Sequence, residues 1–477
     1  MRTSITRHHV SLVVAFVAAV ATLASLSAQS AIPTRGGGSP QGRGQAGGRG
    51  AAQPSNLPTT PVAVALPTLS AEVTGPGRIF ETLMELKPGD DMAHFGYVAH
   101  EYFVSGTADG QPYTTRVVVR RPAQDARFSG LVLAESMHPS GNAWMFHFTH
   151  RYSMSAGHVG VEILTSTAVP FAEFNEARYG RLAVAPGQAP EILAQVGAIL
   201  RHPSGPLGGL SPRSVILAGT SASSGVLINY LPAHMVLRRA DLTPVYDGFL
   251  PSSTGATIRP VDVPLIQVPT MTEVAGGGST ARQDGDAPGD QFRVYEFAGM
   301  AHIDSRDAAA YYPNPCGLPI SRFPMAAYMS VALDHLWRWV DAGTVPPRAP
   351  RILVDRDVTG DGSLMALDEH GNARGGIRNP YVDVPAKQYA VRNEGAPTPV
   401  PGAHPFVAAR PPDAQAQLCR LAGYEMAMPA ADLRRLYGSK AAYVAAVTRS
   451  LDAQTRLGWS LPVYRDLILA DAAAVDF

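Results

Sequence analysis

The hydrophobic positions of this 477-residue chain form short apolar runs that alternate with amphipathic segments. Short apolar runs predict strands buried on both faces, whereas apolar residues that recur every three or four positions predict helices. The expected strands cover residues 97–104, 113–121, 130–134, 158–164, 215–218, 246–250, 264–268 and 293–297. The expected helices cover residues 142–152, 190–200, 226–231 and 325–340. This alternation predicts an α/β fold with a mostly parallel central sheet and helices on both faces.

The pattern changes beyond about residue 350, where Pro, Gly and Asp become frequent. Short strands, such as one over residues 351–354, and a late helix over residues 440–457 are expected there. We therefore expect one domain over residues 67–477, in which residues 350–477 form an irregular C-terminal elaboration packed on the core.

The N-terminal 66 residues are predicted to lie outside this domain. A basic start, an apolar run over residues 10–26 and a small-residue cleavage region predict a signal peptide over residues 1–30. Residues 31–66 are rich in Gly, Arg and Pro and are expected to be a disordered linker. The mature protein should be exported, to the periplasm or the extracellular space, without stable membrane insertion after cleavage.

Charge and cysteine content narrow the function classes. The 39 basic and 39 acidic residues give no net charge, so nothing points to a nucleic acid partner. Cys316 and Cys419 are the only cysteines. In an exported chain such a pair suggests one disulfide, and two separate buried thiols are the alternative.

A small-residue corner joins the expected strand over residues 215–218 to the helix that follows. A nucleophilic serine at such a corner needs small residues two positions before and two positions after it. Gly219 and Ser223 fill these positions around Ser221, which makes Ser221 the preferred nucleophile. Ser223, flanked by Ser221 and Gly225, is the competing candidate. A Ser-rich helix cap with no chemistry is the structural alternative.

A serine nucleophile needs a base, and the base must be held by an acid. In α/β hydrolases the three follow one another in the order nucleophile, acid, base. His302 lies on a small-residue loop just past the last expected strand and is the candidate base. Glu273 is the favoured acid because it lies nearest the end of the preceding strand, and Asp284 and Asp286 remain as alternatives.

The oxyanion formed by serine attack needs preorganised hydrogen-bond donors. The backbone N–H of Ala222, directly after the nucleophile, is the first expected donor. The second should come from the loop over residues 135–141, in which His138 is also a candidate for lining the substrate site.

Two further patterns suggest metal ions, although neither is complete. His147 and His150 lie three apart on an expected helix with His158 nearby, but no carboxylate base is placed as in a zinc protease motif. Residues 355–362 resemble the opening of a calcium loop, yet Ala366 occupies the position of the closing glutamate. We therefore expect no metal and no cofactor.

Several motifs together carry a family resemblance. They are His100-Glu101-Tyr102-Phe103-Val104-Ser105-Gly106-Thr107-Ala108, Gly219-Thr220-Ser221-Ala222-Ser223, Tyr246-Asp247-Gly248-Phe249-Leu250, Ala298-Gly299-Met300-Ala301-His302-Ile303-Asp304 and Gly371-Asn372-Ala373-Arg374-Gly375-Gly376-Ile377-Arg378. From about residue 97 to the C-terminus, the chain resembles a bacterial exported α/β-hydrolase-domain family of serine hydrolases. The resemblance implies that Ser221 is the nucleophile and His302 the base. Where this family often carries two acids, the chain has Met271 and Glu273, and His138 stands in place of a family asparagine.

The sequence thus predicts an exported serine hydrolase, a carboxylic-ester hydrolase that acts on small-molecule esters through an acyl-enzyme. A peptidase or amidase could use the same residues, and a binding protein that retains the fold without activity is the alternative of a different class.

The Gly-rich loop over residues 371–380 is expected to border the pocket, where Arg378 contacts substrate or holds the loop. Pairing of Arg378 with Asp383, without a substrate role, is the equal alternative.

Overall fold

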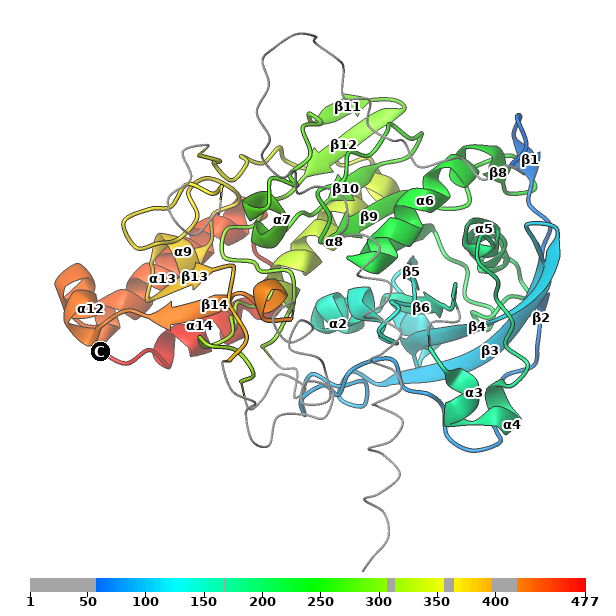
Figure 1. Cartoon of the computed structure of the whole chain (residues 1–477), viewed down its shortest axis with the longest axis horizontal. Coiled ribbons are helices and arrows are strands. Elements are labelled where there is room, and N and C mark those ends of the chain that lie inside the picture. The colour runs from blue at the N-terminus through cyan, green and yellow to red at the C-terminus, as the bar shows by residue number, and fades with distance from the viewer. Residues whose placement is uncertain (1–56, 167–168, 307–313, 356–363, 397–417) are drawn as a thin grey trace, which may run out of the picture.

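The structure is a computed structural model that describes residues 57–166, 169–306, 314–355, 364–396 and 418–477 (Figure 1). The expected signal peptide, most of the expected linker and nearly all of the calcium-loop-like segment lie outside the described residues. Within the described residues, no helix combines the length and the apolar character needed to cross a membrane.

The core of the described structure is one ten-stranded sheet with the strand order β11-β12-β10-β9-β7-β5-β6-β4-β3-β2. The strands β12, β10, β9, β7, β5 and β6 run parallel, while β2, β3, β4 and β11 pair in the antiparallel sense. The strand bounds are β2 (Thr68–Leu69), β3 (Tyr97–Ala108), β4 (Gln111–Pro122), β5 (Leu131–Ser136), β6 (Val159–Ile163), β7 (Ser214–Thr220), β9 (Gly248–Ser252), β10 (Leu265–Gln267), β11 (Gly285–Ala287) and β12 (Asp290–Val294). The mostly parallel α/β sheet predicted from the sequence is confirmed.

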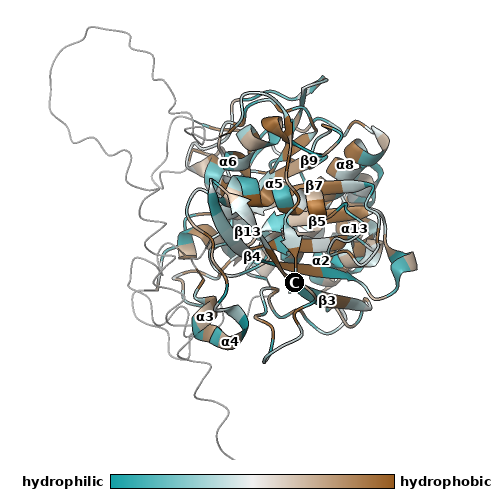
Figure 2. Cartoon of the chain, turned by 90° about the vertical axis from the view of Figure 1, so that its right-hand side faces the viewer, coloured by the Kyte–Doolittle hydropathy of each residue, from teal (hydrophilic) through white to brown (hydrophobic). Residues whose placement is uncertain are grey.

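Helices cover both faces of this sheet because its central strands are apolar on both sides. On β5, Leu131 and Leu133 face the hydrophobic cluster beneath α2 (Trp144–Ala156) and α8 (Met325–Ala342). Val132 and Ala134, which alternate with them, face the opposite cluster beneath α5 (Ala189–Ile199) and α6 (Ala222–Val236). Figure 2 shows the hydrophobic colouring concentrated along β5 and β7 between these layers.

Short elements connect the main layers. They are β1 (Val62–Ala63), the 3₁₀ turn at Asp125–Arg127, α3 (Phe171–Phe174), α4 (Glu176–Tyr179), β8 (Leu237–Arg238) and α7 (Met271–Ala275). Strand β1 pairs in parallel with β8 and falls inside the expected linker. Regular structure therefore begins before residue 67, the expected domain boundary.

The C-terminal segment packs against the core, as the sequence suggested for residues 350–477. Its elements are α9 (Pro380–Asp383), β13 (Lys387–Ala390), β14 (Tyr424–Ala427), α12 (Ala430–Tyr437), α13 (Lys440–Arg456), a 3₁₀ turn at Pro462–Tyr464 and α14 (Arg465–Ala473). One hydrophobic cluster joins Leu333 of α8 to Val447 of α13 and Ile468 of α14. The strand expected over residues 351–354 is absent from the described structure, where Ile352 and Val354 make only isolated bridges.

The expected disulfide is present, and it ties this tail to the loop that carries His302. Cys316 and Cys419 are 103 residues apart and are bonded, with their Cα atoms 5.6 Å apart. Two residues beyond Cys419, the carbonyl oxygen of Leu421 accepts the backbone N–H groups of His302 (3.1 Å) and Ile303 (3.3 Å). The disulfide therefore stabilises the segment that holds the His302 loop in place.

Reduction of the disulfide should lower the melting temperature by up to about 5 °C, because closing a loop of this length is worth up to about 4–5 kcal/mol in the chain-entropy model. Differential scanning calorimetry of the oxidised and the fully reduced protein measures this change. The double variant Cys316→Ser/Cys419→Ser should match the reduced protein. An unchanged melting temperature in both samples would contradict a stabilising role for the bond.

Candidate active site

The expected nucleophile Ser221 lies at the junction between β7 and α6 in a left-handed backbone conformation, with φ 52° and ψ −118°. Few non-glycine residues adopt positive φ, and those that do are often strained residues in functional sites. The backbone N–H of Ser221 donates to the carbonyl oxygen of Ser252 at the end of β9 (3.1 Å). This sharp strand-to-helix turn is the geometry of a nucleophile elbow.

The small residues on either side of Ser221 are required by close packing. A Cβ added to Gly219 would lie 2.6 Å from the carbonyl oxygen of Ser223, a distance that real Cβ atoms do not show. The hydroxyl of Ser223 accepts the backbone N–H of Thr220 (2.9 Å) and donates to the Thr220 carbonyl oxygen (2.9 Å). Because Ser223 is also fully buried, its hydroxyl holds the turn and is poorly placed to act as the competing nucleophile.

The expected base and acid are in contact. His302 Nδ1 lies 2.6 Å from Glu273 Oε1. The second carboxylate oxygen of Glu273 accepts the backbone N–H (2.8 Å) and the hydroxyl (2.7 Å) of Thr270, the N-cap of α7. Burial raises the pKa of Glu273, but the nearby His302 and the bonds from Thr270 outweigh burial, so the pKa is lowered overall. Glu273 is therefore an ionised group that orients the imidazole of His302.

The alternative acids lie elsewhere. Asp286 of β11 pairs with Arg293 and with Arg348, the latter at 2.6 Å. Asp284 accepts the backbone N–H of Val294 at 3.2 Å. Among the described residues neither carboxylate contacts His302, so the geometry favours Glu273.

Ser221 and His302 approach each other at the carboxyl end of β9. Ser252 accepts the N–H of Ser221, and the hydroxyl of the next residue, Ser253, donates to the carbonyl oxygen of His302 (3.5 Å). No hydrogen bond joins the Ser221 hydroxyl to the His302 ring within the described residues. Such contacts are often long in unliganded enzymes and tighten when substrate binds. The structure thus brings the two residues to one strand end without forming the bond between them.

His138 follows β5 at the same edge of the sheet. The paired register of the parallel strands β5 and β7 ends with Glu135 opposite Ala218, and His138 and Ser221 each follow three residues later at this edge of the sheet. His138 Nδ1 accepts the backbone N–H of Ser140 (3.0 Å). Burial, and next the charge of His302, lower the pKa of His138 to about 4. Nδ1 also lies 2.8 Å from the Ser140 hydroxyl. The low pKa leaves the ring neutral near pH 7, with one of its two nitrogens as a donor.

The backbone donors of this loop are largely committed to other partners. Met137 donates to Ile163, His138 to Asn142, Gly141 to His138, and Ala143 to Thr82, in each case through a backbone N–H to a carbonyl oxygen. Pro139 has no N–H. Among the described residues of the loop, His138 Nε2–H and the backbone N–H of Asn142 are the donors left without a partner. His138 is the one that comes directly after β5, the strand paired with β7 before Ser221.

The backbone N–H of Ala222 is also available. Ala222 is the first residue of α6, and first-turn N–H groups have no partner inside their own helix. No other partner for this N–H is found in the described part of the chain. Its position directly after Ser221 is that of the expected oxyanion donor.

Arg378 belongs to the tail. Its guanidinium donates to Asp383 Oδ1 (2.7 Å) and to the carbonyl oxygens of Ala373 (2.6 Å) and Val382 (2.8 Å). All three guanidinium nitrogens are therefore engaged within 371–383. These contacts match the pairing with Asp383 and the holding of the loop, and they give no support to a substrate contact.

The described residues contain no group of three or more His, Cys, Asp or Glu side chains arranged to hold a metal ion. His147 and His150 stack on α2 with their ring centres 5.8 Å apart, while His158 Nδ1 contacts the Ser129 hydroxyl (2.7 Å). The three histidines proposed as a zinc pattern thus do not converge on one point.

We expect Arg378→Ala to lower the melting temperature while kcat/KM on the best substrate stays within about twofold, because within the described structure the arginine contacts only residues 368–383 of the tail. Thermal melting and steady-state kinetics measure the two effects. Arg374→Ala, which changes an arginine four residues earlier in the same loop, is the matched control. A large loss of kcat/KM in Arg378→Ala at unchanged melting temperature would show instead that Arg378 contacts substrate.

The chain has partial similarity to solved structures and matches one family over most of its length. Parts of the chain are similar to brefeldin A esterase, a bacterial homologue of human hormone-sensitive lipase, at 18% identity, with 33% of this chain and 40% of that chain covered and a TM-score of 0.22. A lipase/esterase from Lactobacillus plantarum is similar at 14% identity over 38% of this chain and 81% of that chain, with a TM-score of 0.25. The chain thus spans less than half the length of the brefeldin A esterase. No curated protein matches the chain. The model of the alpha/beta hydrolase domain family matches residues 58–470, and the chain therefore belongs to that family.

Proposed function

We propose that this protein is an exported serine hydrolase that cleaves small-molecule carboxylic esters through an acyl-enzyme. The observation that carries the proposal is the strained backbone of Ser221 at a strand end shared with the bonded pair Glu273–His302. A serine becomes a nucleophile only beside a base, and the base needs an acid that fixes its tautomer. Ser221, His302 and Glu273 supply these three roles.

In the first step, Ser221 Oγ attacks the ester carbonyl carbon while His302 Nε2 accepts the hydroxyl proton. Glu273 keeps the Nδ1–H of His302 hydrogen-bonded and stabilises the imidazolium that forms. The bonds from Thr270 hold the carboxylate in the required orientation. His302 then gives the proton to the leaving alcohol, and an acyl-serine remains.

The negative oxygen of the tetrahedral intermediate requires hydrogen-bond donors on the side opposite His302. We assign the backbone N–H of Ala222 as one donor and the Nε2–H of His138 as the other. The loop that usually supplies a backbone N–H has committed most of its amides elsewhere, which supports a side-chain donor. The lowered pKa of His138 keeps the ring neutral at pH 7, so the donor tautomer persists during turnover.

Water enters in the second step and cleaves the acyl-serine by the same route. His302 now takes a proton from water, and the hydroxide equivalent attacks the acyl carbon; the carboxylic acid leaves and Ser221 recovers its proton. These steps require no metal and no cofactor. Because the same residues also serve amides, the substrate class must be decided by experiment.

We also propose that the mature protein works outside the cytoplasm. The basic and apolar N-terminal segment of residues 1–30 and the disulfide between Cys316 and Cys419 both fit an oxidising compartment. In this proposal residues 67–477 form the hydrolase domain, and residues 350–477 are the elaboration that supports the His302 loop.

Ser221→Ala should abolish both labelling by a fluorophosphonate probe and ester hydrolysis, since the probe reacts only with an activated serine. Ser223→Ala should still be labelled, because the Ser223 hydroxyl holds the turn and does not react. His302→Ala should lower kcat by at least ~10³-fold.

A panel of matched p-nitrophenyl esters and p-nitroanilides then separates esterase from amidase activity. Full esterase activity in the Ser221→Ala variant would contradict the proposed serine hydrolase mechanism.

His138→Ala should lower kcat by about 10²-fold to 10³-fold with a small change in KM, because an oxyanion donor acts mainly in the transition state. His138→Asn supplies an amide N–H in the same place and should recover part of the rate. His138→Leu fills a similar volume without a donor and is the matched control. Equal rates for the Asn and Leu variants would show that His138 has only a packing role.

A further inference from the structure

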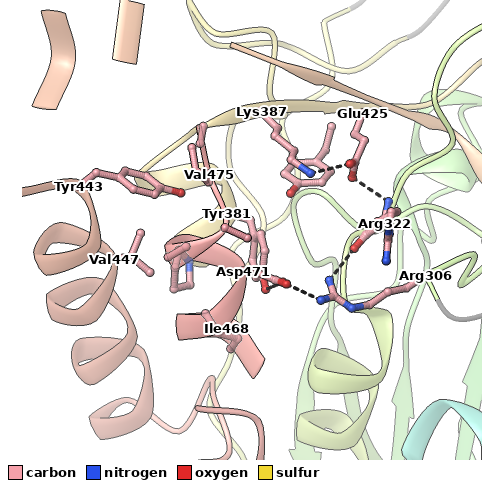
Figure 3. A pocket seen from close by; sticks show the side chains of 15 residues that line it. Arg306, Arg322, Tyr381, Lys387, Glu425, Tyr443, Val447, Ile468, Asp471 and Val475 are labelled. Carbon is pink, nitrogen blue, oxygen red and sulfur yellow. Dashed lines mark hydrogen bonds and ion pairs between the residues drawn. The ribbon is translucent and has the colours of Figure 1, made fainter. Parts of the chain in front are cut away.

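A cavity of about 290 Å³ lies within the C-terminal segment (Figure 3). Its walls come from α9, β13, β14, α13 and α14, together with Arg306 and Arg322 from the segment before α8. None of Ser221, Glu273 and His302 lines it. The volume is at the small end of the range for ligand pockets, which is about 300–1,000 Å³.

The charged side chains of the cavity gather on one side (Figure 3). Asp471 accepts from the guanidinium of Arg306 and from the hydroxyl of Tyr381 (2.6 Å). Glu425 accepts from Lys387 Nζ (2.6 Å) and from the backbone N–H of Arg322 (2.8 Å). Both lining carboxylates are therefore already paired with cations.

Donors without partners remain in the cavity. The Lys387 ammonium carries three N–H groups, and its bond to Glu425 uses one of them. Tyr389 and Tyr443 are 4% and 5% exposed, and among the described residues their hydroxyls have no hydrogen-bond partner. Figure 3 shows the hydroxyl of Tyr443 directed into the cavity. Neither hydroxyl is sealed from solvent, so both can donate to an acceptor that enters the cavity.

The other side of the cavity is apolar. Val447 of α13 and Ile468 of α14 are buried and face it, and Val475 continues this wall. Burial and the carboxylates of Glu425 and Asp471 raise the pKa of Tyr389 well above its usual value, so its hydroxyl remains a neutral donor. A ligand must therefore offer an acceptor group at one end and an apolar body at the other.

We propose that this cavity is a binding site for a small monocarboxylate with an apolar body of about single-ring size. Its carboxylate accepts hydrogen bonds from Tyr389, Tyr443 and Lys387, while its body packs against Val447 and Ile468. The three lining cations, Arg306, Arg322 and Lys387, exceed the two carboxylates by one, which matches a single negative charge. A dianionic phosphate would leave an excess negative charge beside Glu425 and Asp471. This site is separate from the proposed hydrolase chemistry and does not depend on it.

Isothermal titration calorimetry of the full mature protein with benzoate tests the site, and benzamide serves as the neutral ligand of the same shape. Benzoate should bind at least about tenfold more tightly than benzamide, because only the anion uses all three donors. Tyr389→Phe, which removes one hydroxyl, should weaken benzoate binding by about tenfold, and Lys387→Met by at least as much. Tyr102→Phe on β3 and Lys440→Met at the start of α13 are the matched controls and should bind benzoate like the unchanged protein.

Three results would overturn the proposal. They are the absence of benzoate binding, equal binding of benzoate and benzamide, and benzoate binding that Tyr389→Phe and Lys387→Met leave unchanged. The last result would assign the bound benzoate to another site, such as the catalytic one. Circular dichroism and thermal melting confirm that each variant is folded, and Tyr389→Phe tests the site independently of Lys387→Met. Ser221→Ala should bind benzoate at the cavity as the unchanged protein does, whatever its effect on ester hydrolysis.

Discussion

The left-handed backbone of Ser221 is the constraint on which the site depends. A strained residue persists only where its surroundings fix it, and here they do so through buried serines. The hydroxyl of Ser224 lies 2.7 Å from the carbonyl oxygens of both Gly219 and Ser252, to either of which its one proton can be donated, and it accepts the backbone N–H of Ser252 (3.0 Å). Ser253, the next residue after β9, is also left-handed, with φ 51°. The ends of β7 and β9 are thus tied to each other, and the Ser-rich composition of the corner follows from this need.

The second constraint is the support that the tail gives to the His302 loop. The backbone N–H of Ala298 donates to Ile377 (3.2 Å), and the side-chain amide of Asn379 donates to the carbonyl oxygen of Ala298 (2.7 Å). At the other end of the loop, the carbonyl oxygen of Leu421 holds His302 itself. The loop that carries the base is therefore bonded on both sides to residues beyond 350. The elaboration is part of what positions the imidazole of His302, and in the proposed mechanism its loss would leave Glu273 and Ser221 without a fixed base.

The sequence predicted the central sheet well because its strands are buried on both faces and so form continuous apolar runs. Where burial depends on distant segments the prediction was weaker. The last parallel strand was expected over residues 293–297, yet β12 covers Asp290–Val294, and Phe297 instead bridges to Ile377 of the tail. Strands β13 and β14 pair across more than 30 residues of chain, far more than the two to five residues of a hairpin loop, so local pattern could not reveal their pairing.

The candidate site residues could be predicted from local motifs, whereas the hydrogen bonds among them could not. Ser221 and His302 follow from local motifs, and Thr270 with Glu273 forms a capping box that the sequence displays and that the strand-end argument did not use. His138 is different, because its role follows from an inventory of donors. The amide of Met137 completes the sheet beside β6, that of Ser140 turns inward to the imidazole, and that of Gly141 closes a turn. A loop folded in this way has few backbone N–H groups left for an oxyanion, so a neutral side-chain donor is the simplest way to complete the hole. The backbone N–H of Ser140 is thus spent on Nδ1 of His138, and an N–H that Nδ1 accepts favours the tautomer with the proton on Nε2, which the proposed oxyanion role needs.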